Sequence, residues 1–263
     1  MKLLFLGDVV GRPGRRAVES LLPRFRAEES VQFVVANCEN ASGGKGIDPD
    51  NAEQLFDLGI DVLTSGNHIW RNPAIVPYMG DNARLLRPCN FPPGNPGSGW
   101  IVRGVGKSSL TVGVLNLIGR VFMGPADCPF QIARDAVREI RRQTNIVFVD
   151  MHGEATSEKV AMGRFLDGSV SAVVGSHTHV QTADETILPG GSAYLTDAGM
   201  CGPEDSVLGV KTEAVVRRFL TQMPTRFDVA SGPALVQGAL VEIDDVTGRA
   251  TGISRVRERV AAP

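Results

Sequence analysis

Side chains that can bind a metal ion follow five short apolar segments of this 263-residue chain. The segments end near positions 6, 36, 64, 149 and 175. In open α/β sheets, ligands bind beyond the carboxyl ends of the strands, so we expect these side chains to share one rim. The set holds all 4 histidines of the chain. Its members are Asp8, Glu39, Asn40, Asn67, His68, His152, His177 and His179.

These residue types indicate transition-metal chemistry. Imidazole together with carboxylate favours Mn, Fe, Zn or Ni over Ca or Mg, and the set is too large for one ion. Two ions ~3.5–4 Å apart need a bridging carboxylate, and they can clamp both the attacking and the leaving oxygen of a phosphoryl transfer. Glu39 is the natural bridge. One residue separates His177 from His179, so on an extended segment their side chains would point the same way and serve neighbouring ions.

Each of these residues also has an ordinary structural interpretation. An aspartate after a strand is usually a cap or turn residue. Asn67 follows Gly66 and suits a turn with positive φ. A single histidine is more often hydrogen-bonded than bound to metal. The joint placement of four histidines with Asp8 and Glu39 at strand ends favours the metal site for the set as a whole.

The elements that must position these groups alternate between strands and helices. We expect strands at 3–6, 32–36, 62–64, 146–149 and 170–174, and helices at 15–29, 51–58 and 157–165. Pro23 should kink or shorten the first helix. Residues 100–105 and 110–117 should form antiparallel strands, as should 234–260 around a turn at 245–248. The pattern predicts a mixed α/β sheet system in a single domain, 1–263.

Composition excludes several other classes of protein. The net charge of −2 argues against bulk electrostatic binding to DNA or to an anionic membrane, and 6% aromatic residues argue against a base-stacking surface. We therefore expect neither a stable nucleic-acid complex nor a membrane partner. The four cysteines are too scattered for a disulfide framework or a structural zinc site. With no signal-peptide core and no membrane span, the expected location is the cytoplasm.

Several strings in the sequence carry a resemblance to a known family. Residues 7–8 (GD), 66–68 (GNH) and 175–179 (GSHTH) resemble the signature blocks of calcineurin-like metallophosphoesterases. The longer strings at 7–14 (GDVVGRPG), 40–46 (NASGGKG), 154–159 (EATSEK) and 197–203 (DAGMCGP) resemble the bacterial YmdB-like subfamily. Two departures from the broad superfamily pattern fit that subfamily. Val10 stands where a histidine is usual, and Glu39 stands where the bridging aspartate is usual, which favours metals harder than zinc.

The resemblance implies a four-layer αββα sandwich, two iron or manganese ions, and hydrolysis of 2′,3′-cyclic nucleotides or similar small phosphodiesters to nucleoside monophosphates. Asp8, His179 and Asn40 would hold one ion. Asn67, His152 and His177 would hold the other, with Glu39 as the bridge. A hydroxide shared by the ions would attack phosphorus, and His68 would act as the general acid. A phosphomonoesterase, a phosphoprotein phosphatase and a metal-binding regulatory protein are the alternatives.

Substrate contacts are less sharply indicated. Ser42 and Lys45 lie in a glycine-rich loop that resembles a phosphate cradle without the P-loop spacing, and Arg12 is a further candidate. Residues 120–130 form an apolar stretch with glycine and proline that suits a lid, a nucleobase wall, internal packing or an oligomer contact. A homo-oligomer is expected from the general frequency of such assemblies.

Overall fold

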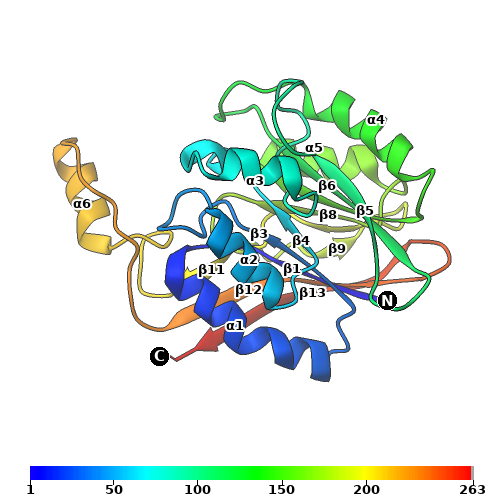
Figure 1. Ribbon diagram of the computed structural model, residues 1–263, viewed down its shortest axis with the longest axis horizontal. Helices are drawn as coiled ribbons and strands as arrows, with labels where there is room; N and C mark the ends of the chain where they lie inside the picture. The colour runs from blue at the N-terminus through cyan, green and yellow to red at the C-terminus, as the bar shows by residue number, and fades with distance from the viewer. Residues whose placement is uncertain (262–263) are drawn as a thin grey trace.

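Two mixed β-sheets lie face to face between two layers of helices in the computed structural model, which describes residues 1–261 (Figure 1). The first sheet has the order β2-β11-β12-β1-β3-β4, with β13 paired to β12, and the second has the order β5-β6-β7-β8-β10-β9. The strands of the first sheet are β1 (Lys2–Leu6), β2 (Asp8–Val9), β3 (Phe33–Asn37), β4 (Val62–Thr64), β11 (Met200–Pro203), β12 (Ala234–Ile243) and β13 (Ala250–Val260). Those of the second are β5 (Trp100–Gly104), β6 (Thr111–Ile118), β7 (Ile146–His152), β8 (Ala172–Ser176), β9 (Thr186–Ile187) and β10 (Ala193–Leu195).

Helices cover the outer face of each sheet. The helices are α1 (Gly11–Glu28), α2 (Pro49–Asp57), α3 (Ile75–Asp81), α4 (Pro129–Ile140), α5 (Thr156–Leu166) and α6 (Thr212–Thr221), with a 3-10 turn η1 at Ile69–Arg71. The apolar residues of α1 and α2 pack on the first sheet, and those of α4 and α5 pack on the second. The expected four-layer αββα sandwich is therefore confirmed.

Alternation along β1 explains how one strand serves two layers. Successive side chains of a strand point to opposite faces of its sheet. Leu4 and Leu6 join the core beneath the helices, whereas Leu3 and Phe5 join the core between the two sheets. Phe5 meets Phe148 of the second sheet there, with ring centroids 5.0 Å apart.

The first helix differs from its prediction. It begins at Gly11 rather than at residue 15, and it runs unbroken through Pro23 to Glu28. Pro23 lies on the solvent side of α1. Water can therefore satisfy the backbone carbonyl one turn earlier, whose helical hydrogen bond the proline removes. Pro23 was predicted to kink or shorten the helix. The helix is not shortened there, so that part of the prediction was wrong.

Most of the other predicted elements are present at nearly their predicted positions. β5 and β6 pair antiparallel, and β12 and β13 form the C-terminal hairpin. The helices α3, α4 and α6 were not predicted. In the segment 120–130, Val121 and Phe122 are exposed, whereas Phe130 lies in the first turn of α4 and packs edge-on against Phe165 with ring centroids 5.5 Å apart.

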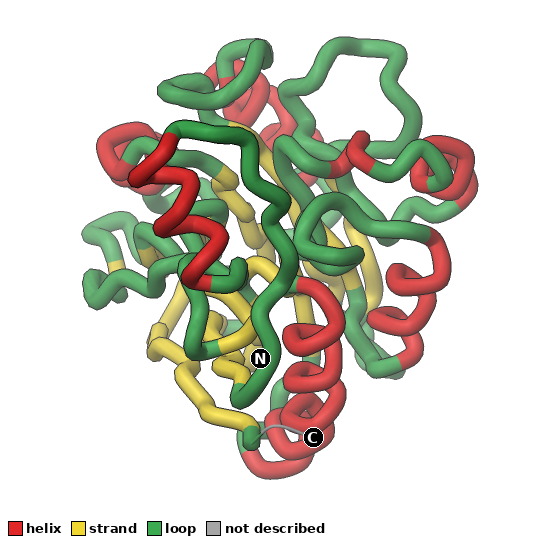
Figure 2. Tube along the Cα trace, turned by 90° about the vertical axis from the view of Figure 1, so that its left-hand side faces the viewer, coloured by secondary structure: helices red, strands yellow, loops and turns green. Residues whose placement is uncertain are grey.

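The helix α6 projects from the left-hand side of the body in Figure 1. Figure 2, viewed from that side, shows α6 and the segment that returns from it in front of the sheets. Only Val215 of α6 is buried. Within residues 1–261, no helix has the length and apolar character needed to cross a membrane.

Candidate metal centre

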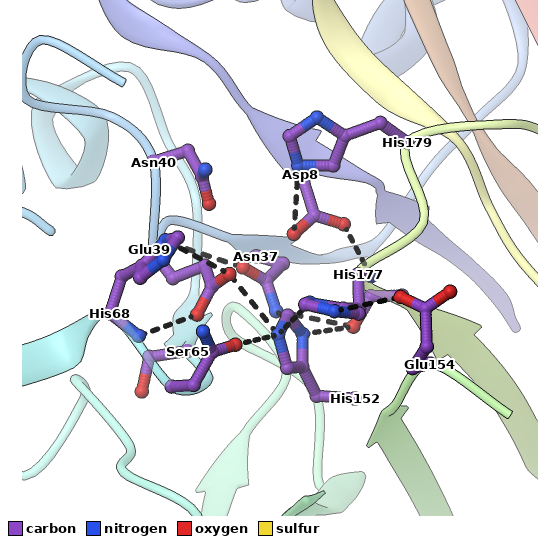
Figure 3. A network of polar contacts seen from close by, with 12 residues as sticks. Asp8, Asn37, Glu39, Asn40, Ser65, His68, His152, Glu154, His177 and His179 are labelled. Carbon is purple, nitrogen blue, oxygen red and sulfur yellow. Dashed lines mark hydrogen bonds and ion pairs between the residues drawn. The ribbon is translucent and has the colours of Figure 1, made fainter. Parts of the chain in front are cut away.

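The strand ends bring the predicted site residues together. Asp8 opens β2, Glu39 and Asn40 follow β3, and His152 is the last residue of β7. The remaining members follow β4 or β8: Asn67, His68, His177 and His179. β1, β3 and β4 run parallel, as do β6, β7 and β8, so their carboxyl ends meet at one edge of the sandwich. Figure 3 shows the side chains gathered at that edge.

One group of donor atoms converges on Nε2 of His152. Glu39 Oε1 lies 3.1 Å from this nitrogen, Asn67 Oδ1 lies 3.2 Å from it, and His177 Nδ1 lies 3.1 Å from it. The carboxylate and amide oxygens have only lone pairs to offer. Glu39, His152 and His177 each place a ligand atom within 4.8 Å of the others, a spacing suited to one metal ion.

Hydrogen bonds behind His152 fix which of its nitrogens faces the group. Ser176 Oγ lies 2.6 Å from the buried Asp150 carboxylate and 2.9 Å from His152 Nδ1. A serine hydroxyl has one proton, so when it donates to Asp150 it accepts from Nδ1–H of His152. This arrangement turns the Nε2 lone pair toward Glu39 and Asn67, as a metal site requires.

The other two imidazoles are fixed in the same way. His177 Nε2 lies 3.2 Å from the carboxylate of Glu154, so Nε2–H donates and Nδ1 keeps its lone pair. His179 Nδ1 lies 2.9 Å from the carbonyl oxygen of Leu208, which can only accept, so Nε2 of His179 is free to bind. Glu154 and Leu208 were not among the predicted site residues, although Glu154 follows His152 by only two positions.

A second group of donors surrounds Asp8. His179 Nε2 lies 3.7 Å from Asp8 Oδ1, and the other Asp8 oxygen accepts from the backbone N–H of His177 at 3.0 Å. Asn40 donates its Nδ2 to the carbonyl of Gly44 at 3.1 Å. Asp8 Oδ1 and Asn40 Oδ1 are buried and accept no hydrogen bond from residues 1–261. Buried oxygens without donors are costly, and a cation would satisfy both.

The electrostatics of the first group also favour a positive charge at its centre. Burial would raise the pKa of Glu39, but the charges and hydrogen bonds of His152 and His68 outweigh it and lower that pKa to about 2. Burial would lower the pKa of His152, but the Glu39 and Asp8 carboxylates raise it to about 9. Burial and the nearby His152 charge lower the pKa of His177 to about 3. The shifts at Glu39 and His152 together show that the surroundings of this group favour positive charge.

The pKa of Asp8 results from a different balance of burial and charge. Its complete burial raises the pKa to about 6, against the attraction of His179 and His152. A divalent cation beside this carboxylate would favour the ionised form. The donor set of both groups thus fits divalent ions.

His68 lies on the wall of the same site without joining the converging donors. Its backbone N–H donates to Glu39 Oε2 at 3.0 Å, and its ring Nδ1 lies 3.6 Å from Glu39 Oε1. Burial lowers the pKa of this imidazole, although Glu39 opposes the shift. A cavity of about 230 Å³ opens here, between Glu39, Asn40, His68, Glu154, His177, Thr178, His179 and Leu208.

The segment after β8 is not extended as predicted. His177 and His179 have φ values of 99° and 63°, in the left-handed region. The period-two argument for their directions was therefore wrong, and the two rings reach different donor groups because the backbone turns between them. A buried ion pair holds this turn: Lys159 Nζ lies 2.6 Å from Asp197 Oδ2, which accepts from the backbone N–H of Thr178 at 3.2 Å and from its hydroxyl at 2.8 Å.

The three predicted substrate contacts differ in position. The hydroxyl of Ser42 bonds to Asp48 and Asn51 at the start of α2, at 2.6 and 2.8 Å. Lys45 lines a cavity that adjoins the metal site. Arg12 lines a separate hollow between α1 and the end of β13. Of the three, only Lys45 borders a cavity that His68 and His179 also line.

Comparison with known proteins assigns the family. The model of the YmdB-like protein family matches residues 4–256. The chain belongs to the YmdB-like family. It is 45% identical over 257 residues to a 2′,3′-cyclic-nucleotide 2′-phosphodiesterase of Bacillus subtilis, covering 97% of this chain and 96% of the relative. This agrees with the resemblance carried by the strings at 7–14 and 197–203.

Two solved structures have the same fold throughout. A hypothetical protein of Thermus thermophilus is 38% identical with a TM-score of 0.92, and all of both chains is covered. A novel phosphatase of Mycoplasma pneumoniae is 32% identical with a TM-score of 0.92, and the match covers 100% of this chain and 95% of that one. The match to both structures covers the whole of this chain.

Proposed function

We propose that this YmdB-like protein is a dinuclear metal-dependent phosphodiesterase that opens 2′,3′-cyclic nucleotides to nucleoside monophosphates. The observation that carries the proposal is the set of three imidazoles, each fixed by an outer acceptor so that its other ring nitrogen points into the cluster of donors. Such a donor set suits transition-metal ions, and two-metal sites of this kind serve phosphoryl transfer. The Bacillus subtilis relative, a 2′,3′-cyclic-nucleotide 2′-phosphodiesterase, supplies the substrate class.

The residues divide between two ions. We assign Asn67, His152 and His177 to one ion and Asp8, Asn40 and His179 to the other, with Glu39 shared. Iron or manganese is the proposed metal, because the set is rich in oxygen donors and has no thiolate. When bound, such ions make a water molecule nucleophilic near neutral pH and neutralise charge on phosphoryl oxygens.

The remaining steps belong to the chain itself. His68 stands beside Glu39 with its backbone anchored, so its ring can deliver a proton to the ribose oxygen that leaves phosphorus. Lys45 supplies a positive charge at the border of the same cleft. Ser42 and Arg12 are given no substrate contact in this proposal, because the hydroxyl of Ser42 bonds to Asp48 at the start of α2 and Arg12 lines a separate hollow.

Removal of metal should abolish hydrolysis of 2′,3′-cyclic AMP. Protein stripped by a chelator and then reconstituted anaerobically with Fe²⁺ or Mn²⁺ should regain turnover, measured as release of 2′- or 3′-AMP. A phosphomonoester, p-nitrophenyl phosphate, serves as the comparison substrate. If two ions are bound per chain and the cyclic diester is still not hydrolysed, the proposal fails. Monoester turnover under those conditions would favour the phosphomonoesterase reading.

Replacing His68 by alanine should slow turnover by about 10²-fold, the lower end of what a positioned general acid contributes. Metal content, measured by elemental analysis, should stay at the wild-type value, since His68 is outside the converging donors. Loss of one ion in this variant would instead make His68 a ligand and contradict its role as the acid. A substrate with a good leaving group, such as a p-nitrophenyl diester, should be much less affected, because its leaving oxygen needs no proton.

A further inference from the structure

A second cavity adjoins the metal cleft and is not explained by the reaction at phosphorus. Its volume is about 150 Å³. It shares Asn40, His68, His179 and Leu208 with the first cavity, so the two are compartments of one cleft. The wall farther from the metal ligands is apolar, formed by Val10, Val210, Phe227 and Val229.

The apolar wall is built from the base of the α6 excursion. Val210 and Val229 form an antiparallel β-bridge where the chain leaves for α6 and returns. Ala230 N–H donates to the carbonyl of Gly209 at 2.9 Å, and Lys211 N–H donates to that of Asp228 at 3.1 Å. These bonds hold the two arms of the excursion together, so the wall is a fixed part of the fold.

Two glycines on the side opposite the apolar wall allow Val229 to pack closely against the backbone. A Cβ atom placed on Gly44 would lie 2.9 Å from Val229 Cγ2, and one placed on Gly11 would lie 3.1 Å from the same carbon. Both glycines have positive φ, which a side chain would also disfavour. The glycine-rich loop therefore packs against the α6 base, and Phe227, two residues before Val229, lines the compartment.

We propose that this second compartment, called here the base pocket, binds the nucleobase of the cyclic nucleotide while the first compartment binds its phosphate. This inference rests on the proposed function. Cavities of about 230 and 150 Å³ suit one small ligand, since sites for such ligands run to about 300–1,000 Å³. A polynucleotide would need a longer groove with more cationic groups.

The chemistry of the walls matches the two ends of a mononucleotide. Phe227 is 38% exposed and offers an aromatic face in an otherwise aliphatic wall, the kind of surface on which a base stacks without regard to its identity. His68 lines both compartments, and the ribose of a bound nucleotide would lie between them. The leaving oxygen is a ribose oxygen, so a proton donor is needed at that junction.

The base pocket is also linked to a metal ligand. Leu208 lines both compartments, and its carbonyl accepts from Nδ1 of His179. A base in this pocket would therefore lie beside the residue whose carbonyl orients His179.

The test compares Phe227→Ala with a matched control, Phe219→Ala. Phe219 lies on α6, is 80% exposed and lines neither compartment. Two substrates are used with the reconstituted enzyme: 2′,3′-cyclic AMP, and methyl riboside 2,3-cyclic phosphate, which has the same reacting ring and no base. Phe227→Ala should raise KM for cyclic AMP about ten-fold, a value within the range for loss of one base–aromatic stack. It should have much less effect on the abasic diester.

Phe227→Trp should retain the wild-type KM for cyclic AMP, because a larger aromatic face still stacks. Phe219→Ala should resemble the wild type with both substrates. An equal rise in KM for both substrates in Phe227→Ala would overturn the base pocket, as would no rise for either. Equal kcat/KM of the wild type for the nucleotide and the abasic diester would also overturn it while leaving the diesterase function in place. Hydrolysis of neither diester by the wild type would overturn the function itself.

Discussion

Replacing Glu39 by glutamine should lower turnover of 2′,3′-cyclic AMP by about 10³-fold or more. Loss of the shared carboxylate removes several kcal/mol of charge stabilisation, and each ~1.4 kcal/mol is a factor of ten in rate. Glu39 Oε2 accepts from the backbone N–H of His68 at 3.0 Å, so the amide oxygen of glutamine will take that place. The amide N–H then faces Nε2 of His152, 3.1 Å away, and satisfies its lone pair without a cation.

Elemental analysis of Glu39→Gln should show a loss of bound metal. The fold should remain, because the substitution keeps the shape of the side chain. The metal-free variant should nevertheless melt below the metal-free wild type, because it loses the buried pairing of Glu39 with His152. Glu154→Gln is the matched control: Glu154 is half-exposed and orients His177 from outside the converging donors, so metal affinity should fall only about 10–100-fold. Two ions per chain and wild-type turnover in Glu39→Gln would refute the shared role of Glu39.

Replacing Lys159 by methionine should destabilise the protein by about 3–5 kcal/mol, the usual cost of removing one partner of a buried ion pair. Lys159 is 1% exposed, and its ammonium lies 2.6 Å from Asp197. The variant leaves the Asp197 carboxylate buried among the neutral donors of Thr178 and Gly199. Urea unfolding of the metal-free protein measures the difference in the free energy of unfolding.

The same variant should also weaken metal binding. Thr178 stands between His177 and His179, and Asp197 holds its backbone N–H and its hydroxyl. Loosening that turn should misplace His177 and His179, which we propose as ligands of different ions. Lys107→Met is the control, since Lys107 is exposed in the turn after β5 and its replacement should change stability by less than about 0.5 kcal/mol. An unfolding free energy of Lys159→Met equal to that of Lys107→Met would show that the buried pair contributes nothing.

The sequence predicted which side chains meet at this edge of the sandwich because strand ends are local features. Apolar runs of four or five residues followed by Asp8, Glu39 or His152 can be identified without knowing how the strands pair. Parallel pairing then places their ends at one edge. The orienting groups could not be found in this way. Ser176 and Asp150 orient His152 through contacts across the sheet, and Leu208 contributes only a backbone carbonyl.

The differences between the predicted and the observed helices also have physical causes. Pro23 was weighed as a helix breaker, but its exposed position lets water replace the lost hydrogen bond. The helix α4 did have a signal, because Pro129 at its first turn precedes apolar residues at Ala133, Val137 and Ile140. α6 buries only Val215, so its helical pattern does not show which core of the chain it would pack against.

The position of β1 within the first sheet has a consequence for biosynthesis. β1 pairs on one side with β3 and on the other with β12, where Lys2 lies opposite Glu242. At roughly 5–20 residues per second, a ribosome needs on the order of tens of seconds to travel between those two strands. During that interval one edge of the nascent β1 stays without its partner and exposes backbone that can pair with another chain. We therefore expect β1 to complete its pairing only after β12 has been synthesised.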